Sequence, residues 1–415
     1  MEAFDQIETQ VLTPDDVELA GTLLRVGDLV AIPTETVYGL GANGLAADAM
    51  DRIYAAKGRP SDNPLILHVC DQSMVHRLVR HITPLEQTLM DTFWPGPLTI
   101  TFEKSALVPE RATGGLSRVA LRCPNHDVCR EMIRIAGVPI AAPSANRSGR
   151  PSPTTAEAVL HDMKGRIHAV VDAGPCEIGV ESTVVQVEDD TVIILRPGGV
   201  TKEMLEMVAD HVVYDTALHD PTEAPKAPGM KYRHYAPDMP VQVVVGSSQD
   251  LVDAIQSNFI GENLQGTVSI SSSGDKVSET IGDRYLLDGN SSEYASEDRN
   301  DRYMPKRMGV FVSQQTWDRL VASLDAEVQA VIGGTHVSHI LSLGSGADTQ
   351  EIVGIIYGET AKPVSLANQL YEGLLAFNEK DVDLLIVEGC EKVGLGVAVM
   401  NRLEKASGGN VSYLD

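Results

Sequence analysis

Four segments of the sequence share one pattern, in which an apolar run gives way to small polar residues, often with an arginine beside them. They are residues 33–43, 142–155, 179–185 and 194–201. Small hydroxyl and amide side chains let a ligand approach the backbone, and a guanidinium forms paired hydrogen bonds with phosphate or carboxylate. One such strand end can arise by chance, but four favour a shared cleft. We therefore predict one cleft that binds a small anionic ligand.

The stretch AAKGRPSDNP, residues 55–64, adds two cations to this group. In one interpretation it is only a helix end, where Lys57 complements the helix dipole, Gly58 caps the helix and Pro60 prevents its continuation. In the other, Lys57 and Arg59 bind phosphates, the lysine as a point charge and the arginine as a fork. The usual glycine-rich nucleotide-binding motifs are absent. The residue pattern leaves both interpretations open.

The remaining segments also have purely structural interpretations. The Ser, Asn, Gly and Pro content of residues 142–155 is typical of a turn. Glu35 and Glu181 could form a carboxylate pair or bind a metal, and their spacing does not decide between these alternatives. No G-x-S-x-G elbow and no H-E-x-x-H motif is present. The sequence therefore indicates a binding cleft without a familiar catalytic set.

The composition narrows the class of protein. The chain has 415 residues, of which 43% are hydrophobic and only 5% aromatic, and its formal net charge is -25. This length predicts two domains. The acidic charge and the few aromatic residues argue against stable nucleic-acid binding, which uses basic surfaces and stacking platforms. A few cations gathered in one cleft can still attract a small anion.

The cysteines and the N-terminus indicate the compartment. The five cysteines are odd in number and scattered, and no two form a C-x-x-C pair. This pattern disfavours a zinc ribbon and favours reduced thiols. The first residues, MEAFDQIETQ, lack the basic and then apolar pattern of a signal peptide. No apolar run approaches the ~18 residues of a membrane span. We expect a cytoplasmic protein with no membrane partner.

Residues 11–213 alternate short apolar runs with helical patterns, which predicts an α/β domain. One helix should begin near Thr13 and stop at Gly27, and another should use Asp48 as its N-cap and stop at Gly58. Some connections are too short for a crossover helix, so several strands should be antiparallel. The predicted strands span residues 29–33, 98–102, 118–123, 139–145, 168–174, 182–187 and 191–197.

Residues 214–240 are rich in proline and show no periodicity, which predicts an extended linker. Its basic and aromatic second half could dock on a domain surface or act as a lid that orders when nucleotide binds. This second half contains Lys231, Tyr232, Arg233, His234 and Tyr235.

From Val241 onward, strand and helix patterns alternate again and predict a smaller Rossmann-like sheet. Residues 273–306 are polar and charged, which predicts a loop or insertion. The predicted helices cover 248–259, 315–332 and 365–381, and the predicted strands cover 241–246, 267–272, 308–313, 339–344 and 383–389.

Seven motifs in the first half resemble, in order and spacing, those of the YrdC-like L-threonylcarbamoyladenylate synthases. They are PTETVYGLGA, KGRPSDNPLILHV, FWPGPLT, ALRCP, APSANRSGRPSPT, GVESTVV and LRPGG. The linker segment APGMKYRHYAP and the C-terminal GLGVAVMNRLEKASGG resemble the long, two-domain form of this family. The resemblance implies a YrdC-like twisted mixed sheet with helices in residues 1–213, a linker in 214–240 and a smaller Rossmann-like α/β domain in 241–415.

This family makes L-threonylcarbamoyl-AMP and pyrophosphate from L-threonine, bicarbonate or CO2, and ATP with Mg²⁺. The resemblance implies the same reaction here, with no metal ligand assigned to the protein. It also implies a downstream tRNA threonylcarbamoyl transferase complex that modifies the adenosine next to the anticodon.

The resemblance also implies roles for individual residues. Lys57 and Arg59 would be the catalytic residues, and Tyr235 would close over the nucleotide. The residues implied for ATP are Lys57, Arg59, Asn63, Ser144, Asn146, Ser152, Arg196 and Tyr235. The residues implied for threonine are Thr36, His68, Arg122 and Ser182.

Three other functions are alternatives to this one. An RNA-binding module fits poorly with the net charge of -25. Carbamoyl transfer in hydrogenase maturation uses a related domain, but those proteins carry zinc-finger cysteine pairs that this sequence lacks. A regulatory protein that binds nucleotide without turnover is the third, since an inactive cleft can also hold ATP.

Overall fold

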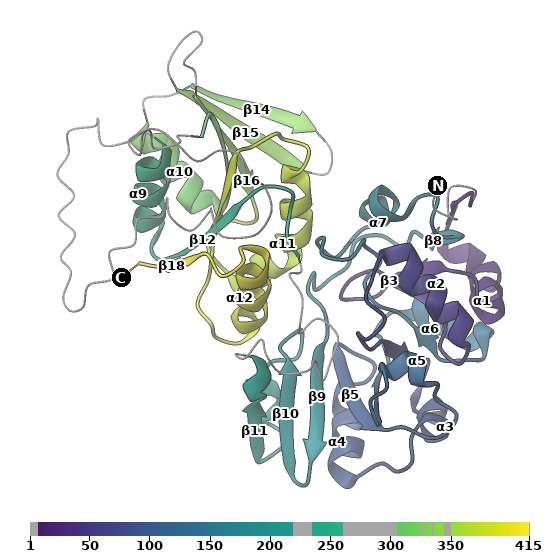
Figure 1. Cartoon of the computed structure of the whole chain (residues 1–415). Helices are drawn as coiled ribbons and strands as arrows, with labels where there is room; N and C mark the ends of the chain where they lie inside the picture. The colour runs from purple at the N-terminus through teal and green to yellow at the C-terminus, as the bar shows by residue number, and fades with distance from the viewer. Residues whose placement is uncertain are drawn as a thin grey trace, which may run out of the picture.

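The computed structural model contains two α/β lobes, each built around one sheet (Figure 1). An eleven-stranded sheet uses residues between Gln10 and Tyr214, and a seven-stranded sheet uses residues between Val241 and Tyr413. The predicted fold class is therefore confirmed. Among the residues described, no helix combines the length and the apolar character that crossing a bilayer requires. The structure describes residues 7–218, 235–259, 305–324, 327–333, 336–343 and 350–414.

The first sheet is mixed, with the strand order β1-β8-β2-β3-β7-β4-β6-β5-β9-β10-β11. The pair β9 and β10 is antiparallel, because only Asp189 and Asp190 connect the two strands. The strands are β1 Gln10–Leu12, β2 Val30–Ile32, β3 Gly39–Asn43, β4 Ile66–His68, β5 Leu98–Glu103, β6 Arg118–Arg122, β7 Ile140–Ala141, β8 Ala169–Val171, β9 Thr183–Glu188, β10 Thr191–Arg196 and β11 His211–Tyr214.

Eight α-helices and three short 3-10 helices accompany this sheet among the described residues. The α-helices are α1 Val17–Val26, α2 Ala47–Lys57, α3 Val75–Leu78, α4 Pro84–Phe93, α5 Glu110–Thr113, α6 Asp127–Ala136, α7 Ala156–Met163 and α8 Lys202–Leu205. The 3-10 helices are Pro14–Asp16, Gln72–Met74 and Thr216–Leu218.

The capping signals predicted two helix ends correctly and one helix start wrongly. Thr13 forms a capping box with Asp16, and Gly27 ends α1 in the left-handed conformation. Gly58 ends α2 in the same way. The N-cap of α2 is Ala46 instead of Asp48, which lies in the first turn. An acidic side chain is favourable there as well, because the N-terminus of a helix carries partial positive charge.

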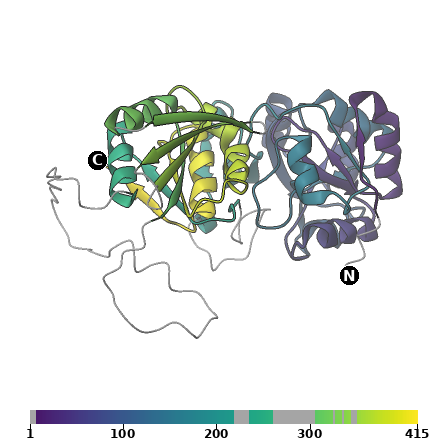
Figure 2. The ribbon, with the colours of Figure 1, turned by 90° about the horizontal axis from the view of Figure 1, so that it is seen from above.

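The second sheet has the order β14-β15-β16-β13-β17-β12-β18. Within it, the neighbouring strands β16, β13, β17, β12 and β18 are parallel to one another. Helices cover both faces, with α9 and α10 on one side and α11 and α12 on the side toward the first lobe (Figures 1 and 2). The strands are β12 Val241–Val245, β13 Arg307–Val312, β14 Glu327–Gly333, β15 His336–Leu343, β16 Gln350–Ile356, β17 Leu384–Glu388 and β18 Val411–Tyr413. The helices are α9 Ser248–Phe259, α10 Gln314–Ser323, α11 Pro363–Phe377 and α12 Leu395–Ala406.

The helix predicted over residues 315–332 is wrong in its second half. Helix α10 ends at Ser323, and β14 pairs antiparallel with β15 along its whole length. Pairing with a neighbouring strand outweighs a weak helical pattern when β-branched residues such as Val328, Val331 and Ile332 are present. The predicted strand 267–272, nearly all of the segment 273–306 and linker residues 219–234 lie outside the described residues.

The two lobes share an apolar cluster. Val37 and Val180 from the first lobe pack with Leu366 and Leu370 of α11 and with Val399 of α12. Burial of apolar surface drives this contact without directional constraint. The shared cluster places α11 and α12 against the loops that precede β9, which is where the candidate site lies.

Candidate active site

The structure brings all four polar segments into one cleft, as the sequence predicted. The empty space of this cleft, including its open mouth, is about 680 Å³. Its lining residues are Thr34, Val37, Gly39, Arg59, Pro64, Leu65, Ile66, His68, Arg122, Ala142, Pro143, Ser144, Asn146, Arg150, Ser152, Glu181, Ser182, Arg196 and Tyr235.

Strand ends position these side chains. Strands β4 and β6 are parallel and in register, so His68 and Arg122 at their last positions are partners. Carboxyl ends of parallel strands meet at one edge of a sheet, which is a common place for ligand sites. Arg196 ends β10, and Ser182 directly precedes β9. The sheet register therefore gathers residues that are far apart in the sequence.

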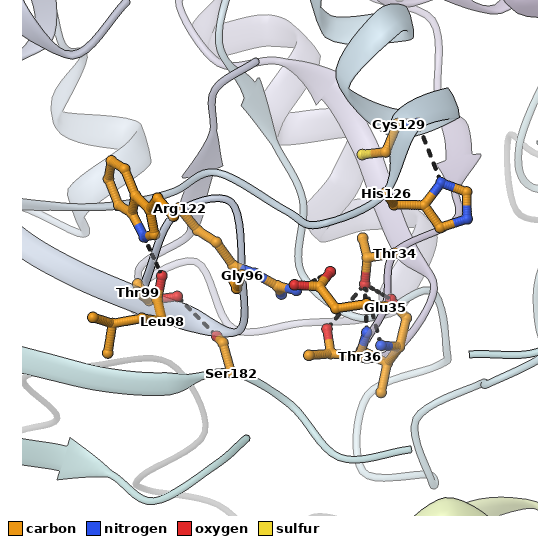
Figure 3. Close-up of polar contacts among 12 residues, drawn as sticks. Thr34, Glu35, Thr36, Gly96, Leu98, Thr99, Arg122, His126, Cys129 and Ser182 are labelled. Carbon is orange, nitrogen blue, oxygen red and sulfur yellow. Dashed lines mark hydrogen bonds and ion pairs between the residues drawn. The ribbon is translucent and has the colours of Figure 1, made fainter. Parts of the chain in front are cut away.

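Arg122 is paired with Glu35 at one side of the cleft (Figure 3). The Nη2 of Arg122 lies 2.6 Å from Oε2 of Glu35, and both side chains are less than 5% exposed. The Nε of Arg122 donates to the Gly96 carbonyl at 3.4 Å. A guanidinium held in this way is pre-oriented for a carboxylate or another anion.

The second acidic residue, Glu181, is paired with an arginine of its own. The Nε of Arg402 lies 3.0 Å from Oε2 of Glu181, whereas Glu35 is held by Arg122. Within the residues that the structure describes, no three His, Cys, Asp or Glu side chains gather as a metal site would require. Glu35 and Glu181 therefore do not pair with each other, and each carboxylate is held by its own arginine.

Three of the four residues predicted for threonine line the cleft, namely His68, Arg122 and Ser182. Thr36 lies behind the surface, where its hydroxyl is 2.9 Å from that of Thr34 (Figure 3). Thr34 also donates to the Val37 carbonyl at 2.6 Å and lines the cleft itself. The sequence indicated Thr34 only as part of a polar rim, because residue type and position do not show which of Thr34 and Thr36 faces the cleft.

His68 is a neutral imidazole at ordinary pH. It is buried, it lies beside Arg122 in the sheet, and its Nδ1 finds no hydrogen-bond partner within the ranges that the structure describes. Burial, together with the positive charge of Arg122, lowers the pKa of His68 to about 3. The ring can therefore offer or accept a hydrogen bond without adding charge.

The lowered pKa of His68 predicts a pH dependence of stability. Between its ordinary pKa of 6.5 and about 3, the unfolded chain binds a proton that the folded chain does not. The free energy of unfolding should therefore fall as the pH is lowered, by about 1.4 kcal/mol per pH unit for this proton. We expect the His68→Gln variant to lose less stability between about pH 6 and pH 4 than the parental protein, measured by urea unfolding. Equal slopes in the two proteins would contradict this assignment.

Arg59 is a further cation that lines the cleft. Its Nη2 donates to the Pro64 carbonyl at 3.2 Å, and among the described residues its buried Nε has no hydrogen-bond partner. Burial lowers the pKa of Arg59 to about 10, so it stays charged at neutral pH. A buried polar atom without a partner is uncommon in proteins and suits a site that awaits a ligand.

Lys57 and Asn63 lie behind the cleft surface and do not line it. The Nζ of Lys57 donates to the carbonyls of Ser144 and Asn146, both at 2.5 Å. Burial and the neighbouring Arg59 lower the pKa of Lys57. Lys57 thus shapes the backbone that carries Ser144 and Asn146, and its direct contact with phosphate stays a prediction. Asn63 is buried, and no described residue donates a hydrogen bond to its Oδ1.

The other residues predicted for ATP line the cleft: Ser144, Asn146, Ser152, Arg196 and Tyr235. The Nε and Nη2 of Arg196 donate to the Ser182 carbonyl at 3.2 and 2.9 Å. Arg150 also lines the cleft and is bound to Asp162 at 3.1 Å. The cationic side chains that line the described part of the cleft, apart from any histidine, are therefore the arginines at positions 59, 122, 150 and 196.

Two residues of the second lobe reach this site and were missed in the sequence. Tyr371 donates its hydroxyl to Glu181, and Arg402 forms the ion pair with the same carboxylate. Burial would raise the pKa of Glu181, but Arg402, Arg196 and hydrogen bonds outweigh it and lower the pKa to about 2. A signal was present, because Arg402 interrupts the apolar face of α12 one turn after Ala398.

Two protein-family models match the chain. The Sua5/YciO/YrdC model, described as telomere recombination, matches residues 22–198. The model described as threonylcarbamoyl-AMP synthase, C-terminal domain, matches residues 200–408. The models thus divide the chain near residue 200, whereas the first sheet continues to Tyr214 and the second begins at Val241.

Curated proteins and solved structures match over nearly the whole chain. The threonylcarbamoyl-AMP synthase of Bacillus subtilis is 39% identical over 97% of this chain and 96% of its own length. That of Pyrococcus abyssi is 37% identical over 94% of both chains. A crystal structure of P. abyssi Sua5 complexed with L-threonine has a TM-score of 0.73 at 33% identity, covering 98% of this chain and 100% of that chain.

Proposed function

The chain belongs to the Sua5/YciO/YrdC family of two-domain threonylcarbamoyl-AMP synthases, and from this premise we propose how its cleft carries out the reaction. In the proposed reaction, L-threonine, CO2 from bicarbonate and ATP give L-threonylcarbamoyl-AMP and pyrophosphate. Threonine carries a carboxylate and ATP a triphosphate, and the cleft presents arginines that can pair with these anionic groups. The observation that carries the proposal is this single cleft lined by Arg59 and Arg196 together with Arg122, His68 and Ser182.

The chemistry needs no covalent nucleophile from the protein. The amine of threonine captures CO2 and loses a proton, which gives a carbamate. A carbamate oxygen then attacks the α-phosphorus of ATP, the bond to the bridging oxygen breaks, and pyrophosphate leaves. Catalysis of this kind depends on orientation and on stabilisation of charge. This agrees with the absence of a familiar catalytic set from the sequence.

The residues divide between the two substrates. We assign the carboxylate of threonine to Arg122, with Ser182 and the neutral His68 beside it, because a guanidinium matches a carboxylate by its fork. We assign the phosphates to Arg59 and Arg196. The hydroxyl and amide groups of the loop from Ser144 to Ser152 would hold the rest of the nucleotide. Lys57 would act through the backbone of that loop.

The residues that line the cleft are compatible with Mg²⁺ that binds as its complex with ATP. Mg²⁺ in nucleotide sites usually keeps several waters and binds the substrate phosphates with few protein ligands. The only carboxylate that lines the described part of this cleft, Glu181, is already held by Arg402 and Tyr371. We therefore propose that Mg²⁺ enters as the ATP complex and screens the phosphate charge.

The product calls for an acceptor. A carbamic–phosphoric anhydride is readily hydrolysed, so a second enzyme must take it up quickly. By resemblance to the family, we propose that a tRNA threonylcarbamoyl transferase complex transfers the group to the adenosine next to the anticodon. The proposal concerns the use of the product and does not require the chain itself to bind tRNA.

Pyrophosphate release from the purified protein tests the proposed function. We expect release only when ATP, Mg²⁺, bicarbonate and L-threonine are all present, and a marked loss when magnesium is chelated. L-Serine serves as the matched control substrate, because it differs from threonine by one methyl group. Binding of ATP without any threonine-dependent release would instead support a regulatory nucleotide-binding protein.

A further inference from the structure

The second lobe reaches the cleft through Tyr371 of α11 and Arg402 of α12. The hydroxyl of Tyr371 lies 3.0 and 2.8 Å from the two carboxylate oxygens of Glu181. The Nε of Arg402 donates to Oε2 of Glu181 at 3.0 Å. From the first lobe, Ser152 donates to Oε1 at 2.6 Å. Donors from both lobes therefore hold one carboxylate that lines the cleft.

Arg402 also holds a second loop of the cleft. Its Nη1 donates to the carbonyl of Pro197 at 2.6 Å. Pro197 follows Arg196, whose guanidinium donates to the Ser182 carbonyl. Arg402 is fully buried, so these hydrogen bonds are shielded from water. One side chain of the second lobe thus links the two loops that present Ser182 and Arg196.

Helix α11 also holds the loop that carries Glu181. A Cβ atom on Gly179 would lie 2.3 Å from the Ala367 carbonyl oxygen, so only glycine permits this approach of the loop to the helix. The Nδ2 of Asn368 donates to the Glu177 carbonyl at 2.7 Å. The loop that carries Glu181 is therefore held against α11 at Glu177 and Gly179.

The charge of Glu181 gives these contacts a functional consequence. A carboxylate that faces a site for triphosphate would repel the ligand, most strongly where water is excluded. Arg402 lies on the far side of this carboxylate and compensates its charge. Its guanidinium also lies 5.8 Å from the ring centre of Tyr235, which lines the cleft and stacks on Tyr371.

We propose that Arg402 and Tyr371 are positioning residues of the cleft, which hold and neutralise Glu181 so that the nucleotide half accepts ATP. The second lobe is in this sense part of the active site, although neither residue lines the cleft. The inference rests on the proposed function, because it takes ATP as the ligand beside Glu181. The second lobe thereby gains a role in ATP binding, although it supplies none of the predicted substrate contacts.

Substitutions at this contact separate positioning from folding. Arg402→Met should raise both the Kd and the KM for ATP about tenfold, since a hydrogen-bonded charge is lost and Glu181 is left uncompensated. Tyr371→Phe should raise them by about threefold, because the ring remains and one hydroxyl is removed. The double variant Glu181→Gln/Arg402→Met should have a Kd and a KM for ATP within about threefold of the parental values, because the uncompensated charge is gone.

The control variant is Arg307→Met, which removes a half-exposed arginine paired with Glu351 on the second sheet, and it should leave ATP binding unchanged. Binding of ATP is measured by titration calorimetry without threonine, pyrophosphate release is measured with threonine, and thermal unfolding checks each variant. If Arg402→Met does not fold, the ATP affinities of Tyr371→Phe and of the double variant test the positioning role.

The outcomes distinguish this inference from the proposed function. Folded variants with parental ATP affinity, or a double variant that stays as weak as Arg402→Met, would overturn the positioning role. A parental protein that releases no pyrophosphate, but whose ATP affinity follows the expected pattern across the variants, would overturn the proposed function and support the positioning role.

Discussion

Replacing Arg122 by methionine should lower kcat/KM for threonine by more than a hundredfold and also destabilise the fold. The guanidinium is the group that we assign to the threonine carboxylate, and loss of one member of a buried charge pair typically costs 2–5 kcal/mol of binding. Its loss also leaves the carboxylate of Glu35 buried without its cation. Breaking a buried pair in this way lowers the free energy of unfolding by about 3–5 kcal/mol.

A second variant separates these two effects. In Glu35→Gln/Arg122→Met the uncompensated charge is gone, so stability should recover while kcat/KM for threonine stays low. The matched control is Arg118→Met on the same strand, where Arg118 is paired with the buried Glu86. This control should lose stability and keep the catalytic constants of its folded fraction. Recovery of activity in the double variant would contradict the role assigned to Arg122.

Replacing Arg59 by alanine should lower kcat/KM for ATP more than tenfold, and by about a hundredfold if Arg59 contacts the reacting phosphates. The fold should persist, because within the described part of the chain the side chain makes one backbone hydrogen bond, to Pro64, and its charge is partly desolvated in the free protein. The kcat/KM of Arg59→Lys for ATP should lie between the values of the parental protein and of Arg59→Ala, since lysine keeps the charge and lacks the forked guanidinium.

Steady-state pyrophosphate release with ATP as the varied substrate measures this effect. Arg134→Ala is the control, because Arg134 is a half-exposed residue of α6 that pairs with Glu131 away from the cleft. A folded Arg59→Ala protein with near-normal turnover would refute the assignment of Arg59 to ATP.

The local signals in the sequence were sufficient for the outline of the fold. Alternating strand and helix patterns predicted α/β lobes, and Gly27 and Gly58 marked the ends of α1 and α2. Such features depend on neighbouring residues, so a short stretch determines them. The predicted N-cap at Asp48 and the predicted helix in the second half of residues 315–332 are wrong. Local preferences are weak at these positions, so tertiary contacts determine the structure there.

The sequence by itself also predicted many of the residues that line the cleft. Polar segments at strand ends predicted one anionic site, and Ser182 and Arg196 from these segments line it, because the sheet brings such ends to one edge. The place of Arg122 beside threonine came from the family resemblance, and Arg122 lines the same cleft.

Only the tertiary structure decided which groups act directly and which act from behind. The sequence contains Lys57 and Arg59 as two similar cations, but folding directs Lys57 to the loop carbonyls and Arg59 to the cleft. It likewise joins Glu181 to Arg402 across 221 positions of the chain. Ion pairs of this kind depend on distance and burial in three dimensions, and no spacing along the sequence encodes them.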